Sequence, residues 1–111
     1  MKSEFVATAW NNGAYHESGT GYGLKIRIKD RDVFFKKSNK QIRLKLEESN
    51  QEILVNTNKP SFWNPVCREL ISKDIGKWLR KNRKSSWKKG HPPKIKMKYL
   101  GGDKYKVTLF H

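Results

Sequence analysis

Negative charge is scarce in this sequence of 111 residues, which has ten Asp and Glu against 25 Lys and Arg. The resulting net charge of +15 exceeds what a small domain needs for solubility. Such an excess indicates an anionic partner, and an extended polyanion satisfies more of it than a small ligand can. We therefore expect nucleic acid as the partner, and we expect no association with a membrane.

Cysteine and long apolar runs are also scarce. Cys67 is the only cysteine, so it cannot form an internal disulfide, and no CxxC or Cys/His spacing for zinc surrounds it. We expect a buried core thiol there, with no metal and no cofactor. No apolar run approaches the roughly 18 residues of a membrane span, and residues 1–10 lack the pattern of a signal peptide. These absences predict a cytoplasmic protein.

The length of the chain fits one ordinary domain, so we expect a single basic domain over residues 1–111. Its hydrophobic fraction of 35% is low, but it includes four Trp and five Phe, which bury large areas in a small core.

Apolar and basic residues alternate with a period of two in four segments, residues 24–29, 42–46, 94–99 and 104–109. This alternation is typical of half-buried strands, and in the first segment it points Leu24, Ile26 and Ile28 inward.

Three further strands are expected at residues 5–10, 33–35 and 52–55, with Asp30 to Asp32 as a tight turn. In the last hairpin, a three-residue turn at 101–103 would keep every apolar residue inside by placing Met97 opposite Val107 and Tyr99 opposite Tyr105.

One helix is expected at about residues 64–81. Asn64-Pro65 is typical of a helix start, and apolar residues recur at spacings of three and four from Cys67 to Leu79. Gly76 weakens this helix and Ser72 could cap a new turn, so a break is an alternative. The predicted fold class is α+β, with a mainly antiparallel, strongly curved sheet or partly open β-barrel of about six to seven strands and this principal helix.

The outward positions of the alternating strands are all basic: Lys25, Arg27, Lys29, Arg43, Lys45, Lys94, Lys96, Lys98, Lys104 and Lys106. Like charges opposite each other destabilise a sheet, so this sorting favours a bound anion. The alternative is that the lysines only keep the sheet soluble and block edge pairing.

A second cluster, residues 77–98, holds ten Lys and Arg and no carboxylate. The predicted nucleic-acid contacts are Lys25, Arg27, Lys29, Arg43, Lys45, Arg80, Arg83, Lys84, Trp87, Lys88, Lys89, Lys94, Lys96, Lys98, Asn11 and Asn12. Arginines among them, such as Arg27, Arg43 and Arg83, can form two hydrogen bonds to guanine, and the side-chain amides of Asn11 and Asn12 match adenine. Loop aromatics, namely Trp10, Tyr15, Tyr22 and Trp87, are candidates for stacking on unpaired bases.

Duplex DNA is the expected ligand, with DNA favoured over RNA, because the outward strand positions hold no aromatic platform for single strands. Two alternatives stay open. A metal-dependent nuclease would use Asp30, Asp32 and Glu47, with Glu48, His16 or His91 as further candidates. A basic protein-binding module or small inhibitor would instead engage an acidic protein partner. Catalysis is the less favoured reading.

Overall fold

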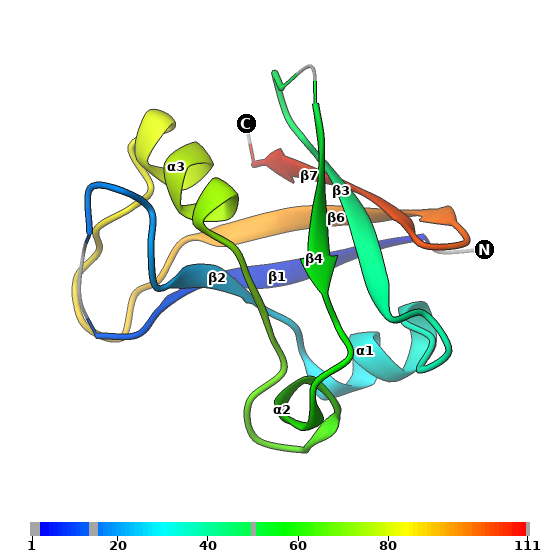
Figure 1. Cartoon of the computed structure of the whole chain (residues 1–111). Coiled ribbons are helices and arrows are strands. Elements are labelled where there is room, and N and C mark those ends of the chain that lie inside the picture. Colours follow the sequence, from blue (N-terminus) through cyan, green and yellow to red (C-terminus); the bar gives the residue numbers. More distant parts are fainter. Residues whose placement is uncertain (1–2, 14–15, 50, 111) are drawn as a thin grey trace.

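The computed structural model describes residues 3–13, 16–49 and 51–110. It has an α+β fold with one mixed, seven-stranded, strongly curved sheet and three short helices in the described part of the chain (Figure 1). The predicted curved or barrel-like α+β fold is therefore confirmed, although the sheet is not purely antiparallel.

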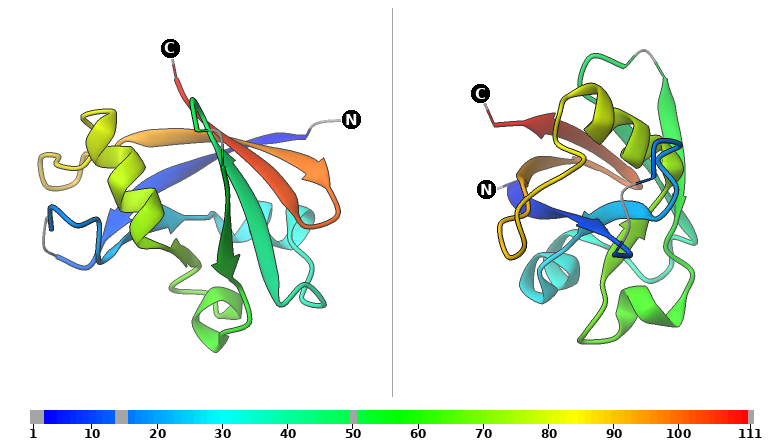
Figure 2. Two further views of the ribbon diagram at one scale, coloured as in Figure 1. Left: turned by 45° about the horizontal axis from the view of Figure 1, so that its top comes forward. Right: turned by 90° about the vertical axis from the view of Figure 1, so that its left-hand side faces the viewer.

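The strands are β1 (Glu4–Asn11), β2 (Tyr22–Lys25), β3 (Gln41–Leu46), β4 (Glu52–Asn56), β5 (Glu69–Ile71), β6 (Lys94–Gly101) and β7 (Lys104–Leu109). The helices are α1 (Ile28–Phe34), α2 (Pro60–Trp63) and α3 (Lys73–Lys81). The strand order is β4-β3-β7-β6-β1-β2-β5, and all neighbours are antiparallel except β3 and β7. The two edge strands β4 and β5 contact each other, so the sheet is a nearly closed barrel (Figure 2).

The interior of the barrel holds a hydrophobic core rich in aromatic rings. Phe34 and Phe35, at the end of α1, enter it side by side: Phe34 stacks on Phe5 and Phe35 stacks on Tyr105, each pair with ring centroids 4.7 Å apart. The Tyr105 hydroxyl donates to the backbone oxygen of Phe34 at 2.6 Å. Burial raises the pKa of this hydroxyl far above its ordinary value, and nearby Tyr99 and Asp103 add to the effect. Helix α1 is thus anchored to β7 through its last residues.

The prediction of a strand, a turn and a returning strand over residues 24–35 is wrong after Lys25. Residues 28–34 form α1, and Ile28 is 42% exposed instead of facing inward. The reason lies in Arg31, which is only 6% exposed and donates to the backbone oxygens of Phe62 and Asn64. Its guanidinium also lies 5.5 Å from the ring centroid of Trp63. These partners are some thirty residues away along the chain, so no local pattern reveals them.

The predicted helix over residues 64–81 is also wrong in its first half. Asn64 does not start a helix, because its side-chain oxygen accepts the backbone N–H groups of Val66 and Cys67 in a turn. Strand β5 follows, pairing with β2, and α3 begins after Ser72, whose hydroxyl accepts the N–H of Asp74. The break considered at Ser72 is therefore where α3 begins. Cys67, expected to be buried, is half-buried and free.

In the last hairpin, the predicted pairs Tyr99–Tyr105 and Met97–Val107 are confirmed. The turn differs, because Gly101 pairs with Lys104 and a bulge at Leu100 takes up the extra residue. The loop itself is therefore two residues long, and the bulge leaves Leu100 exposed on the outside.

Helix α3 packs on the loop before β2 through two glycines. Gly76 lies so close to Gly19 that a Cβ atom on either residue would overlap the backbone of the other segment. Gly19 also has a positive φ of 85°. This contact holds α3 on the side of the barrel away from α1 (Figures 1 and 2).

We predict that Gly76→Ala destabilises the protein by about 1–3 kcal/mol, because the added methyl group forces α3 off the Gly19 backbone. Helix propensity alone predicts the opposite sign, a gain of up to about 1 kcal/mol. Urea unfolding followed by circular dichroism measures the difference. Lys77→Ala, at the neighbouring exposed position of α3, is the control for a substitution on this helix that adds no atom against Gly19. A more stable Gly76→Ala variant would contradict this packing.

Candidate nucleic-acid interface

Three lysines lie side by side on the outer surface of the barrel, one on each of three neighbouring strands. Lys45 of β3 is directly opposite Lys106 of β7, which is in turn directly opposite Lys98 of β6. The row ends at an acid on either side, Glu52 of β4 and Glu4 of β1. The acids thus flank the lysines and do not separate them.

Four further basic residues surround this row. Arg43 is opposite Lys104, and Lys94 and Lys96 precede Lys98 on the same side of β6. We call the seven residues the lysine face: Arg43, Lys45, Lys94, Lys96, Lys98, Lys104 and Lys106. Alternate side chains along a strand are about 6.7 Å apart and neighbouring strands about 4.8 Å apart, so the face is dense in charge.

Few acids neutralise the lysine face. Arg43 Nε lies 3.5 Å from an Asp103 carboxylate oxygen, and Lys96 Nζ lies 4.0 Å from one of Glu4. The other five lysines make no ion pair within 4 Å to any residue that the structure describes. The outward orientation predicted for β3, β6 and β7 is confirmed, and so is the sorting of charge on them.

Some of the predicted nucleic-acid contacts do not belong to the lysine face. Lys29 lies on α1 and not on the sheet. Arg27 follows β2 and keeps an outward position, where its guanidinium binds Asp30 at 2.8 Å and lines a shallow hollow with Lys96. Lys25 is on the outer side of β2, with its Nζ atom 3.9 Å from Glu69.

The cluster over residues 77–98 is spread over several places. Arg80 is on the exposed side of α3, with a guanidinium nitrogen 3.6 Å from a Glu17 carboxylate oxygen. Arg83 lies two residues after the end of α3 and has a φ of 58°. Lys84, Lys88 and Lys89 are exposed in the 82–93 loop, which leads into β6 and the lysine face. The loop is tied to β1 because Ala9 donates its N–H to Pro93 at 2.9 Å.

Of the aromatic candidates for stacking, Tyr22 is excluded because it is 1% exposed, and its hydroxyl donates to the backbone of Ser85. Trp87 is half-buried with its ring against Tyr22. Tyr15 lies outside the described residues. Trp10 takes an outward position on β1, and Phe110 follows β7 on the same side, beside Lys96.

The expectation that no aromatic side chain faces outward is therefore wrong. The signal for Trp10 was present in the sequence, because Phe5, Ala7 and Ala9 alternate with it and point inward.

A hollow of about 300 Å³ opens beside Trp10. Its lining consists of Thr8, Ala9, Trp10, Asn11, Lys25, Trp87, Gly90 and Pro92. The side-chain oxygen of Asn11 accepts the N–H of Gly13, whereas its Nδ2 atom is buried with no acceptor among the described residues. A buried donor without an acceptor costs about 1–3 kcal/mol. Asn12, the other predicted amide, packs its side chain against Gly21.

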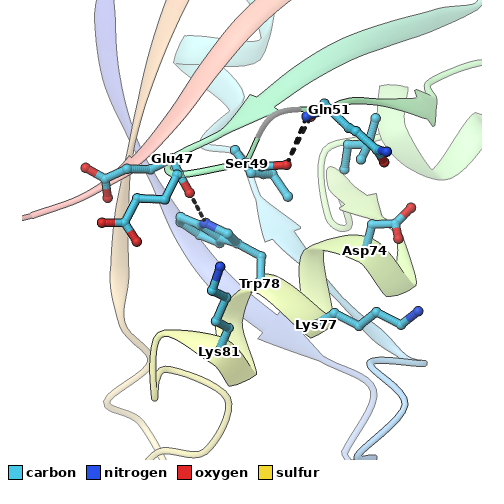
Figure 3. A pocket seen from close by; sticks show the side chains of 10 residues that line it. Glu47, Ser49, Gln51, Asp74, Lys77, Trp78 and Lys81 are labelled. Atoms are coloured by element: carbon cyan, nitrogen blue, oxygen red, sulfur yellow. Dashed lines mark hydrogen bonds between the residues drawn. The ribbon is translucent and has the colours of Figure 1, made fainter.

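Two other hollows lie away from the lysine face. One, of about 220 Å³, lies between α3 and the β3–β4 turn. Its lining includes acidic Glu47 and three residues of α3, acidic Asp74 and basic Lys77 and Lys81 (Figure 3). The indole N–H of Trp78 donates to the Glu47 backbone there at 3.0 Å (Figure 3). Its mixed charges do not single out one kind of ligand.

The other hollow, of about 440 Å³, lies next to α2 and is lined by Lys37, Lys59 and Trp63 among others. Burial lowers the pKa of Lys59, opposed in part by Glu69 and Cys67.

The acidic residues considered for a nuclease are not brought together. Asp30 binds Arg27, Asp32 binds Arg31, and a Glu47 carboxylate oxygen accepts the N–H of Leu109 at 3.1 Å. Within residues 3–13, 16–49 and 51–110, no three His, Cys, Asp or Glu side chains group as metal ligands would.

No protein-family model matches this chain, and no curated protein or solved structure shows significant similarity to it. None of the helices in the described segments is both long and apolar enough to cross a membrane.

We predict that Lys106→Gln stabilises the protein by about 0.2–1 kcal/mol in 50 mM salt, because it removes the central charge of the row from between Lys45 and Lys98. The gain should disappear in 1 M salt, where the screening length is only about 3 Å. Urea unfolding at both salt concentrations measures it, with Lys29→Gln on α1 as the matched control. A loss of stability at low salt would show that the lysines do not repel one another.

Proposed function

We propose that this protein binds nucleic acid, and that the lysine face contacts the phosphate backbone. The observation that carries the proposal is the row of Lys45, Lys106 and Lys98, three directly opposed like charges without an acid between them. Repulsion within such a row lowers the stability of the fold. A bound polyanion offsets this loss because its phosphates attract each of the three lysines.

Duplex DNA is the form that we propose for the lysine face itself. No outward position of β3, β6 or β7 holds an aromatic side chain, and the two outward aromatic residues, Trp10 on β1 and Phe110 after β7, lie at the margin of the lysine face. Lysines hold phosphates without reading bases, so this surface supports binding that depends on salt and little on sequence. Specificity would then come from residues at its margin.

The test is a triple variant, Lys45→Gln with Lys98→Gln and Lys106→Gln. Each phosphate contact contributes about 0.9 to the slope of log K against log salt, so losing three contacts should flatten the slope by about 2 to 3 for duplex DNA. Fluorescence anisotropy with a labelled duplex at four salt concentrations measures it.

The matched control removes the same charge from the region of α1, with Lys29→Gln, Lys36→Gln and Lys37→Gln. This control variant should retain most of the slope of log K against log salt that the unmodified protein shows. Equal slopes for the two triple variants would mean that binding follows net charge alone. If the unmodified protein does not bind duplex DNA, single-stranded DNA or duplex RNA below about 1 μM at low salt, the proposed function is wrong.

A further inference from the structure

We propose that the hollow beside Trp10 binds an unpaired nucleobase, so that the nucleic acid recognised here contains a single-stranded segment next to the duplex held by the lysine face. The inference rests on the proposed function, since the lysine face supplies the affinity for the backbone. Beyond the proposed function, it specifies the kind of nucleic acid that is bound and the site that holds a base.

The ring of Trp10 is half-buried on the outer side of β1. Its neighbour across the strand pair on β2 is Gly23, which has no side chain to cover it. Among the described residues, the ring makes no aromatic contact and its indole N–H has no acceptor. Gly23 must remain glycine because a Cβ atom there would overlap the backbone of Leu70.

The hollow is lined by residues of β1, Lys25 of β2, and Trp87, Gly90 and Pro92 of the 82–93 loop. Its volume of about 300 Å³ is at the lower end of small-ligand sites. Bases stack on indole rings whatever their identity, since every base has a π-face.

One of the residues that line the hollow, Asn11, has a polar side chain. The Nδ2 atom of Asn11 is buried and has no acceptor among the described residues. A base presents carbonyl oxygens and ring nitrogens on its edge, and one that reaches Nδ2 would supply the missing acceptor. The amide therefore favours a ligand with acceptors over a purely apolar one.

Positive charge connects the hollow to the lysine face. Thr8, on its floor, is directly opposite Lys94 of β6 on one side and Lys25 of β2 on the other. Lys94 continues along β6 into Lys96 and Lys98. A strand whose base enters the hollow can therefore have its flanking phosphates at Lys25 and Lys94 and the rest of its backbone on the lysine face.

The experiment compares a single-stranded 12-mer that carries one 2-aminopurine with a blunt duplex of the same length. Trp10→Leu should weaken binding of the single strand by about 5- to 100-fold, the loss of one stacked base, and should abolish the quenching of 2-aminopurine. Binding of the duplex should change by less than about 2-fold. Trp10→Phe keeps an aromatic ring and should restore most of the affinity and the quenching, and thermal melting checks that both variants are folded.

Three results would overturn the inference. If Trp10→Leu binds and quenches the single strand as the unmodified protein does, the base is held elsewhere, while the proposed function stands. If Trp10→Leu weakens single strand and duplex equally, and Trp10→Phe does not restore either, Trp10 has only a structural role. If the unmodified protein binds neither ligand, the proposed function fails together with this inference.

Discussion

The packing of Phe34 and Phe35 inside the curved sheet is the contact on which the rest of the structure depends. These adjacent residues reach strands from both ends of the chain, Phe5 on β1 and Tyr105 on β7, and Phe35 also contacts Phe62. A flat sheet could not surround rings inserted from one helix, so the strands curve around them. Apolar side chains pack inside the curved sheet, and the basic side chains therefore lie on its outer surface.

The outer surface of the barrel places like charges side by side. Lys106 has a lysine directly opposite it on both neighbouring strands, whereas Lys25 is placed beside Glu69. The acids nearest the row, Glu52 and Glu4, lie opposite Lys45 and Lys98 at its two ends and leave Lys106 with no acid directly opposite. Solubility alone is served equally well by mixed charges, which would not repel across strands. This contrast is the basis for interpreting the surface as a binding site.

Strand alternation could be followed from the sequence where the strands are long. The outward positions of β3, β6 and β7 were predicted correctly, because the period of two is a property of the extended backbone itself. The same rule applied to β1 would have found Trp10. It failed over residues 26–35, where Ile26 and Ile28 alternate with basic residues as in a strand but a buried arginine, Arg31, holds a helix through partners at residues 62–64.

By itself, the sequence determined that basic side chains share one face of each alternating strand, because backbone geometry and the burial of apolar groups act locally. Only the tertiary structure decided that β3 lies parallel beside β7, in the register that aligns Lys45 with Lys106. It also decided that Trp10 lies directly opposite Gly23, which has no side chain. Both features depend on the pairing of strands that are far apart in the sequence. That pairing is set by the packing of the aromatic core and by close contacts between backbones, which produce no periodic pattern in the sequence.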